Sequence, residues 1–185
     1  MTEHCEDQSW LRCFGTRMVR AALLDSALYE EVEADPRALG QAALVVILSA
    51  CAAGIGGFAN GGYQGILLSA VAALVGWWIW AYVACLIGTR LLPQSQTTSN
   101  HGELLRTIGF SSAPGILRIL GVVPGLNPWL YALTGTWMLV AMVIAVRQAL
   151  DYTNIWRAIA VCLVGAPVEM VFILFSFLVI GPWPV

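Results

Sequence analysis

The sequence predicts an all-α, polytopic membrane protein with five transmembrane helices and an amphipathic cytoplasmic segment at the N-terminus. Of the 185 residues, 59% are hydrophobic and only 11% are charged, whereas soluble domains carry about 25% charge. The 52 residues from Ala38 to Thr89 carry no formal charge. One helix of that length would measure about 78 Å, although a bilayer core is only about 30 Å thick. The chain must therefore turn back once within this run.

The turn is expected in the glycine-rich segment 56–65, which makes the run a transmembrane hairpin. The first span is predicted at about residues 36–58, because Asp35 can cap the helix and Pro36 suits its first position. The second span is predicted at about residues 64–92, and it ends before a proline.

The third span, at about residues 103–121, is the least regular. Asn100 and Glu103 stand at capping-box spacing where it begins. Pro114 removes a backbone hydrogen bond inside the span and, with Gly115 beside it, predicts a kink or a break. The last two spans are predicted at about residues 128–150 and 155–180.

Arginine placement predicts the orientation, because short cytoplasmic flanks collect basic residues. All nine basic residues are arginines, and every one except Arg118 precedes the first span or lies at a span end on the same side of the predicted topology. These are Arg12, Arg17, Arg20, Arg37, Arg90, Arg106, Arg147 and Arg157. We therefore expect the N-terminus in the cytoplasm and the C-terminus outside. Residues 1–34 form the cytoplasmic amphipathic segment, and residues 35–185 form the transmembrane domain.

Residues 10–34 are interpreted as one or two short helices on the inner membrane surface. Apolar residues recur there at helical spacing, away from the arginines. The stripe consists of Leu11, Phe14, Met18 and Ala22, continued by Leu24, Leu28 and Val32. One interpretation packs the segment on the protein's own loops. The other makes Leu24, Leu28, Tyr29 and Val32 a docking surface for another protein.

The sequence offers no constellation for catalysis. It has no nucleotide-binding glycine loop, no HExxH and no Ser/His/Asp set with recognisable spacing. Its cysteines and histidines do not follow metal-ligand spacing. A net charge of −2 leaves no basic footprint for nucleic acid. We expect no enzymatic activity, no catalytic residue, no metal, no cofactor and no nucleic-acid partner.

Two charged residues, Arg118 and Glu169, fall inside predicted spans, where charge is costly and usually paired. Arg118 follows Arg106 by twelve residues, and Glu169 follows Arg157 by twelve. Both therefore lie about 18 Å beyond a cytoplasmic marker, and a pair between them is plausible. The pair can lock two helices, or it can form a polar site for an ion, a proton or a lipid headgroup. A third reading keeps the two apart, with Arg118 extended outward and Glu169 protonated.

Three tryptophans, Trp77, Trp78 and Trp80, lie near the middle of the second span rather than at an interface. They are interpreted either as bulky residues that face lipid or pack helices, or as a platform for a pigment, a quinone, a sterol-like lipid or a partner helix. The spans contain no histidine to ligate a haem or a chlorophyll.

The chain resembles the Yip-domain family, and in particular its prokaryotic members. The resemblance rests on RAALLDSALYEEVEADP at residues 20–36, on RTIGFSSAPG at 106–115 with GVVPG at 121–125, and on residues 137–150. It implies a five-span, non-enzymatic scaffold or adaptor that binds other membrane proteins and influences membrane shape. Eukaryotic members interact with Ypt/Rab GTPases. Their Asp-Leu-Tyr-Gly-Pro motif is absent here, so the resemblance does not carry GTPase binding over.

The leading functional hypothesis is an integral membrane scaffold or assembly subunit, in the inner membrane of a prokaryote. Its expected partners are the lipid bilayer and other membrane proteins, or further copies of itself. A second hypothesis is a small transporter or channel component that uses Arg118 and Glu169 as its polar site. A third is an accessory subunit of a respiratory or photosynthetic complex, with the tryptophans facing a cofactor or partner.

Overall fold

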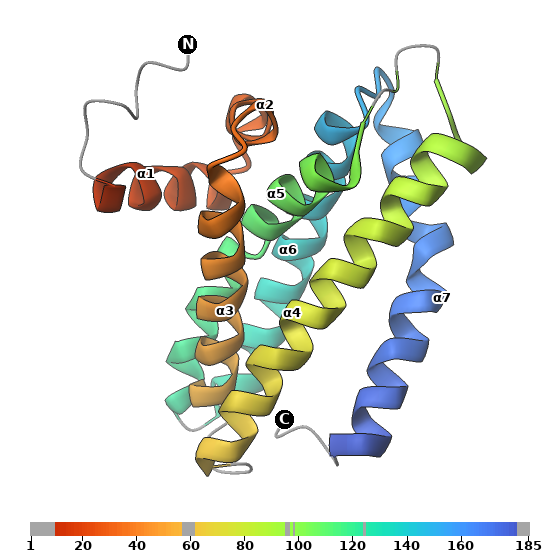
Figure 1. The fold of residues 1–185 in the computed structure, drawn as a ribbon. Coiled ribbons are helices and arrows are strands. Elements are labelled where there is room, and N and C mark those ends of the chain that lie inside the picture. The colour runs from red at the N-terminus through yellow and green to blue at the C-terminus, as the bar shows by residue number, and fades with distance from the viewer. Residues whose placement is uncertain (1–9, 57–61, 95–96, 98, 124, 181–185) are drawn as a thin grey trace.

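The computed structural model is an all-α bundle and describes residues 10–56, 62–94, 97, 99–123 and 125–180 (Figure 1). Two short helices precede a set of long ones. The elements are α1 (Trp10–Ala22), α2 (Ser26–Ala34), α3 (Ala38–Gly56), α4 (Gly62–Leu86), the π-helical turn η3 (Ile87–Leu91), α5 (His101–Ser111), the 3-10 helix η4 (Ala113–Val122), α6 (Asn127–Ala149) and α7 (Ile155–Ile180).

Within the part of the chain that the structure describes, three helices are long and apolar enough to cross a membrane. They are Ala38–Gly56, Ile66–Leu91 and Asn127–Ala149, with mean hydropathies of 2.1, 2.0 and 1.8. The described part of α7 adds a shorter apolar helix, Ile155–Val168. These segments correspond to the first, second, fourth and fifth predicted spans.

The third predicted span is divided between two elements. The α-helix α5 begins at a capping box, in which the Asn100 side chain accepts from Glu103 N and Glu103 accepts from Asn100 N, as predicted. It ends at Ser111, and the 3-10 helix η4 follows with Pro114 in its first turn. A 3-10 helix rises about 2.0 Å per residue rather than 1.5 Å. The distance along the chain from Arg106 to Arg118 is therefore longer than the about 18 Å that an unbroken α-helix would give.

A seam of small residues joins α3 to α5 and η4. Along α3 the contacts recur every seven residues, and along α5 and η4 they recur every six. The facing pairs are Ala42 with Gly109, Ser49 with Gly115, and Gly56 with Gly121. A Cβ built on Gly109 would stand only 2.7 Å from the Ala42 methyl group. The seam holds η4 against α3 in the region where the backbone of η4 is 3-10 helical rather than α-helical.

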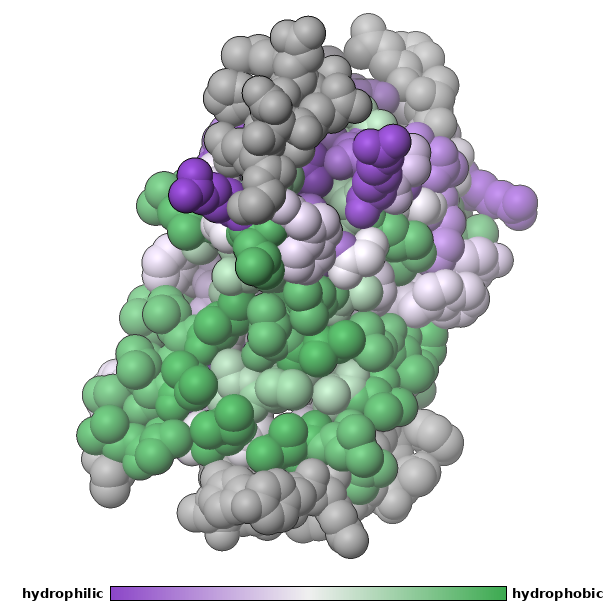
Figure 2. All heavy atoms as spheres, turned by 60° about the vertical axis from the view of Figure 1, so that its left-hand side comes forward, coloured by the Kyte–Doolittle hydropathy of each residue, from purple (hydrophilic) through white to green (hydrophobic). Residues whose placement is uncertain are grey.

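The molecule has one polar end and an apolar belt. Every arginine except Arg118 lies at the end that carries α1 and α2, which is the polar upper region of Figure 2. At this end, two sets of hydrogen bonds join segments that are distant in the sequence. Arg106 of α5 donates to the Val32 and Glu33 carbonyls, and Tyr152 OH donates to the Leu92 carbonyl at 2.8 Å. The apolar belt lies below this polar end in the same view.

Residues 10–34 form two helices rather than one. Leu24 adopts a φ of 62° between them, and its neighbour Asp25 donates its N–H to the Arg20 carbonyl, which closes α1 with a Schellman turn. The Asp25 side chain then caps α2 by accepting from Ala27 N at 3.0 Å. Leu24 therefore belongs to the turn and does not continue the stripe of Leu28 and Val32.

Candidate functional site

One guanidinium ties α1 to the rest of the bundle. Arg17 donates to Glu31 at 3.0 Å, to Asp35 at 2.9 Å and to Gln41 at 3.0 Å, and its own side chain is only 6% exposed. These partners come from α2, from the turn before α3 and from α3 itself. Arg20 adds a second link from α1 to Glu31 at 2.6 Å. The cluster joins α1 to the start of α3, and Figure 1 shows α1 running sideways from that end of α3.

Arg20 also donates to Asp25 at 2.7 Å. The hydrogen bond from Arg20 is the largest of the effects that lower the pKa of Asp25 below its ordinary value. Glu33, on the same helix as Glu31, behaves in the opposite way. Burial raises its pKa to about 7, with further contributions from Asp151 and Glu103. The polar end therefore holds one carboxyl group whose pKa is lowered, Asp25, and one whose pKa is raised, Glu33.

The predicted docking residues of α2 lie inside the molecule. Leu28, Tyr29 and Val32 are each fully buried and pack in one cluster with α3, α5 and α6. The surface that α2 was expected to offer a partner is therefore covered by the protein's own helices, and burial raises the pKa of Tyr29.

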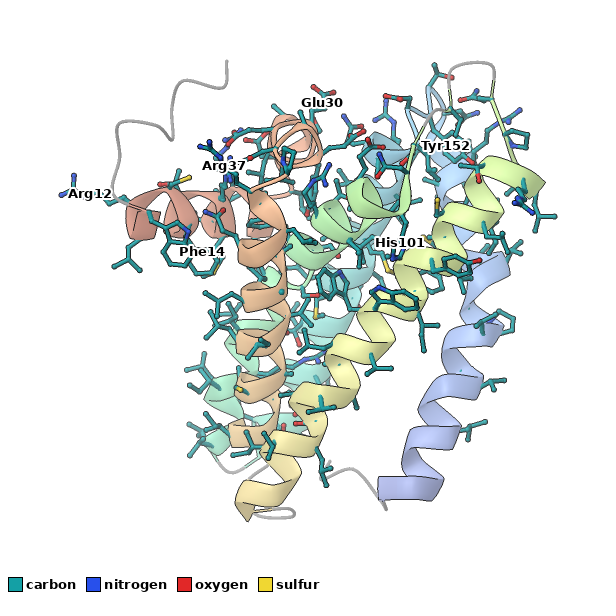
Figure 3. All side chains as sticks on the ribbon, in the orientation of Figure 1. Arg12, Phe14, Glu30, Arg37, His101 and Tyr152 are labelled. Atoms are coloured by element: carbon teal, nitrogen blue, oxygen red, sulfur yellow. The ribbon has the colours of Figure 1, made fainter. Side chains whose placement is uncertain are left out.

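The exposed apolar surface at this end belongs to α1 instead. Leu11 is 72% exposed, Val19 is 59% exposed and Leu23 is 72% exposed. At 100° per residue, Val19 lies about 80° from Leu11, at the edge of the apolar face, and Arg12, Thr16 and Arg20 follow farther round on the polar face. Figure 3 shows Phe14 pointing toward the apolar belt and Arg12 pointing away from the bundle. α1 thus has the face distribution of a helix that lies in a membrane–water interface.

A cavity of about 1020 Å³ lies between α3, α4, α5, η4, α6 and α7. Its wall is mostly apolar, with Trp80 and Met138 among the larger side chains. Hydroxyl groups come from Ser49 and Ser111, and one cationic side chain, Arg118, is present among the residues that line it.

Arg118 reaches this cavity from the broken third segment. Its Nε donates to Thr134 Oγ1 at 3.0 Å, and its guanidinium carbon lies 4.9 Å from the centroid of the Tyr131 ring. Tyr131 in turn donates its hydroxyl to the Ala53 carbonyl at 2.8 Å. Three elements, η4, α6 and α3, therefore position one cation. Sequence reasoning missed Tyr131 and Thr134, although polar residues three positions apart near the start of an apolar helix are a readable signal.

The predicted partner of Arg118 cannot be placed in the same detail. The Glu169 side chain lies outside the described residues, so the Arg118–Glu169 pair stays a prediction. Two neighbours of that position on α7, Ala166 and Met170, line the cavity. Helical register places position 169 about 60° from position 166, near the same face of α7.

The three tryptophans of α4 occupy three different environments. Trp77 donates its indole N–H to the Leu105 carbonyl of α5 at 3.0 Å. Trp80 is 6% exposed and packs on Gly165 of α7, and its N–H has no partner among the residues described. Trp78 is 54% exposed and stacks on Tyr82. Trp77 and Trp80 pack between helices and also line the cavity described above, whereas Trp78 faces outward.

The part of the chain that the structure describes contains no cluster of three or more His, Cys, Asp or Glu side chains able to hold a metal ion. The apolar helices, the polar end and the intramembrane cavity together define an integral α-helical membrane protein. The family model for the Yip1 domain matches residues 25–177, and the chain belongs to that family, which is not a known family of enzymes. No curated protein and no solved structure matches the chain.

Proposed function

We propose that this Yip1-domain protein is a non-enzymatic membrane scaffold that places α1 in one leaflet as an interfacial wedge. The carrying observation is the exposed apolar face of α1, with Leu11 at 72% and Val19 at 59%, held rigidly by the Arg17 cluster. An amphipathic helix in this position displaces headgroups on one side of the bilayer. The same face is available to other membrane proteins.

The proposal includes a five-span topology in the inner membrane of a prokaryote, with a cytoplasmic N-terminus. α5 and η4 together form the third span, because eleven residues of α-helix and ten of 3-10 helix measure about 16 Å and 20 Å. α7 forms the fifth. The gathering of the arginines beside α1 supports a cytoplasmic location for that end.

Reconstitution into vesicles of phosphatidylglycerol and phosphatidylcholine tests the wedge. We expect the wild-type protein to reduce the vesicle diameter, measured by electron cryomicroscopy, in proportion to the protein-to-lipid ratio. The variant with Leu11→Gln and Val19→Gln should lose this effect. Thr16→Gln, on the polar face of α1, is the matched control and should behave as the wild type. Equal diameters for the double variant and the wild type would contradict the proposal.

The adaptor part of the role has its own test. Mild-detergent purification from native membranes, with cross-linking, should recover a stoichiometric membrane-protein partner whose contacts map to α1. Recovery of the chain alone, or only as a homo-oligomer, would argue against an adaptor. A partner cross-linked only to α4 or α7 would move the docking surface away from α1.

The cavity favours a second candidate function, a small transporter that uses Arg118 as its polar site. Broken helices form the substrate sites of many transporters, and the third predicted span is broken between α5 and η4. Flux of small anions into liposomes that contain the protein alone would support this candidate, provided that Arg118→Gln removes the flux. Liposomes that stay sealed would exclude it.

A further inference from the structure

We infer that the cavity beside Arg118 binds one anionic phospholipid, with the phosphate at the guanidinium and an acyl chain along the apolar wall. This site is separate from the wedge, because α1 lies at the polar end and Arg118 lies toward the opposite end of the bundle. The site would hold a structural or regulatory lipid of the leaflet opposite to the one that α1 enters.

The headgroup side of the site is cationic. The described contacts of Arg118 use Nε, through Thr134, and the face of the guanidinium, through Tyr131. Nη2 faces Gly135, where even an added Cβ would remain 3.9 Å away. Among the residues that the structure describes, no carboxylate forms an ion pair with Arg118. The terminal N–H groups are thus the fork that binds phosphate oxygens well.

The depth of Arg118 fits a phosphate at the membrane surface. Thr134 lies seven residues after Asn127, the first residue of α6, which corresponds to about 10 Å. Trp129, near the same helix end, is 77% exposed, as expected for an aromatic residue at the interface. A long arginine side chain at this depth can extend toward the headgroups.

The length of the cavity fits one acyl chain. Its lining residues on α6 run from Tyr131 to Met142, which is about 16 Å along the helix. Half of a bilayer core measures about 15 Å. The wall therefore extends from the headgroup level to about the middle of the bilayer, and a soluble phosphate would leave most of it unfilled.

The cavity opens on the side where lipid is present. Three of its lining residues are exposed, namely Leu139 of α6 at 58%, and Leu163 and Met170 of α7 at 68% and 66%. A chain can therefore enter between α6 and α7 directly from the bilayer. This lateral opening favours a membrane lipid over a solute from water.

The test is native mass spectrometry of the delipidated full chain in nonionic micelles, titrated with phosphatidylglycerol. We expect one bound lipid per chain, and phosphatidylcholine should bind more weakly because it carries no net charge. Arg118→Gln should weaken phosphatidylglycerol binding about ten- to hundredfold, the loss expected for charge-assisted hydrogen bonds. Arg118→Lys should restore most of it. Arg90→Gln, an exposed arginine at the polar end, is the control and should bind as the wild type.

Two further variants test whether the cavity itself binds the lipid and whether Glu169 affects the binding. Ala73→Phe narrows the cavity without touching Arg118 and should weaken both lipids alike. Glu169→Gln should leave phosphatidylglycerol binding unchanged or stronger if the lipid holds Arg118. Equal affinity for wild type and Arg118→Gln, in protein with an unaltered circular dichroism spectrum, would overturn the proposal.

Competition identifies the source of the anion. Neither inorganic phosphate nor oleate, at concentrations matched to the phospholipid, should displace phosphatidylglycerol. Displacement by phosphate would show a simple anion site, and displacement by oleate would show a fatty-acid site. Either result would contradict a phospholipid ligand.

Discussion

Gly109 of α5 lies directly against Ala42 of α3, and no side chain fits between their backbones. A Cβ on Gly109 would meet the Ala42 methyl group at 2.7 Å and the Ala42 carbonyl oxygen at 3.1 Å. The second of these contacts is with backbone, so a change of rotamer cannot relieve it. This close approach starts the seam that continues through Ser49 and Gly56.

Substitution at the seam should therefore destabilise the bundle. Gly109→Ala should lower the free energy of unfolding by about 1–3 kcal/mol through overpacking. Gly40→Ala is the matched control, because a Cβ there meets nothing within 4 Å and alanine is the better helix former by about 1 kcal/mol. Thermal unfolding in micelles, followed by circular dichroism, compares the two. Equal melting temperatures would mean that α5 can move away from α3 at no cost.

Loss of Arg17 should release α1. Arg17→Gln leaves Asp35 without a cationic partner and leaves Glu31 with Arg20 alone, and both carboxylates are about one-fifth exposed. Breaking a fully buried pair costs about 3–5 kcal/mol, and the partial exposure here reduces that figure. We expect faster hydrogen exchange across Trp10–Ala22, with little change in α6. Arg12→Gln, at an exposed position of the same helix, should not alter exchange. Uniform protection in both variants would show that Arg17 does not anchor α1.

The free energy of unfolding should depend on pH through Glu33. Its folded pKa is raised from 4.5 to about 7, so the folded state binds more protons than the unfolded state between these values. Its stabilising contribution is complete below pH 4.5 and is lost as the pH rises through about 7. Glu33→Gln should flatten the stability profile in this window. If Glu33→Gln keeps the wild-type dependence of stability on pH, another group is responsible for it. The surrounding charges are Asp151, Glu103, Arg106 and Glu30.

A single hydrogen bond connects the end of α1 to α6. Trp137 donates its indole N–H to the Ala22 carbonyl at 2.8 Å. Trp137→Phe keeps the aromatic packing and removes the donor, which should cost about 1 kcal/mol. Trp156→Phe, at a 70% exposed position, is the control. Chemical unfolding in micelles should separate the two variants, and identical curves would mean that water replaces the indole at Ala22.

The long helices could be predicted because length and charge alone define them. The uncharged run from Ala38 to Thr89 leaves room for two helices and a glycine-rich turn, and α3 and α4 follow it. The Asn100–Glu103 capping box was readable because both partners lie within one turn. Pro114 predicted a break, but not that the ten residues Ala113–Val122 around and after it would be 3-10 helical. That geometry depends on the α3 seam, which involves residues far away in the sequence.

The candidate site was harder to predict for a related reason. Periodicity identified Leu28 and Val32 as one apolar face of α2 but could not say what would cover it, and the protein's own helices do. Arg118 stood out as an intramembrane charge. Its contacts with Tyr131 and Thr134 depend on how η4 packs against α6, and the cavity depends on how α7 leaves the bundle. Neither relationship is encoded in local spacing.

The Arg17 cluster also has a mechanical consequence. The Arg17 guanidinium donates hydrogen bonds to α2, to the turn before α3 and to α3. For this reason α1 cannot tilt independently of the bundle. In the proposed wedge, lateral pressure on α1 would act on the first turn of α3, because Gln41 of α3 accepts a hydrogen bond from Arg17. The seam residues Ala42, Ser49 and Gly56 belong to the same helix, so α3 would connect the membrane surface at α1 with the opposite end of the bundle.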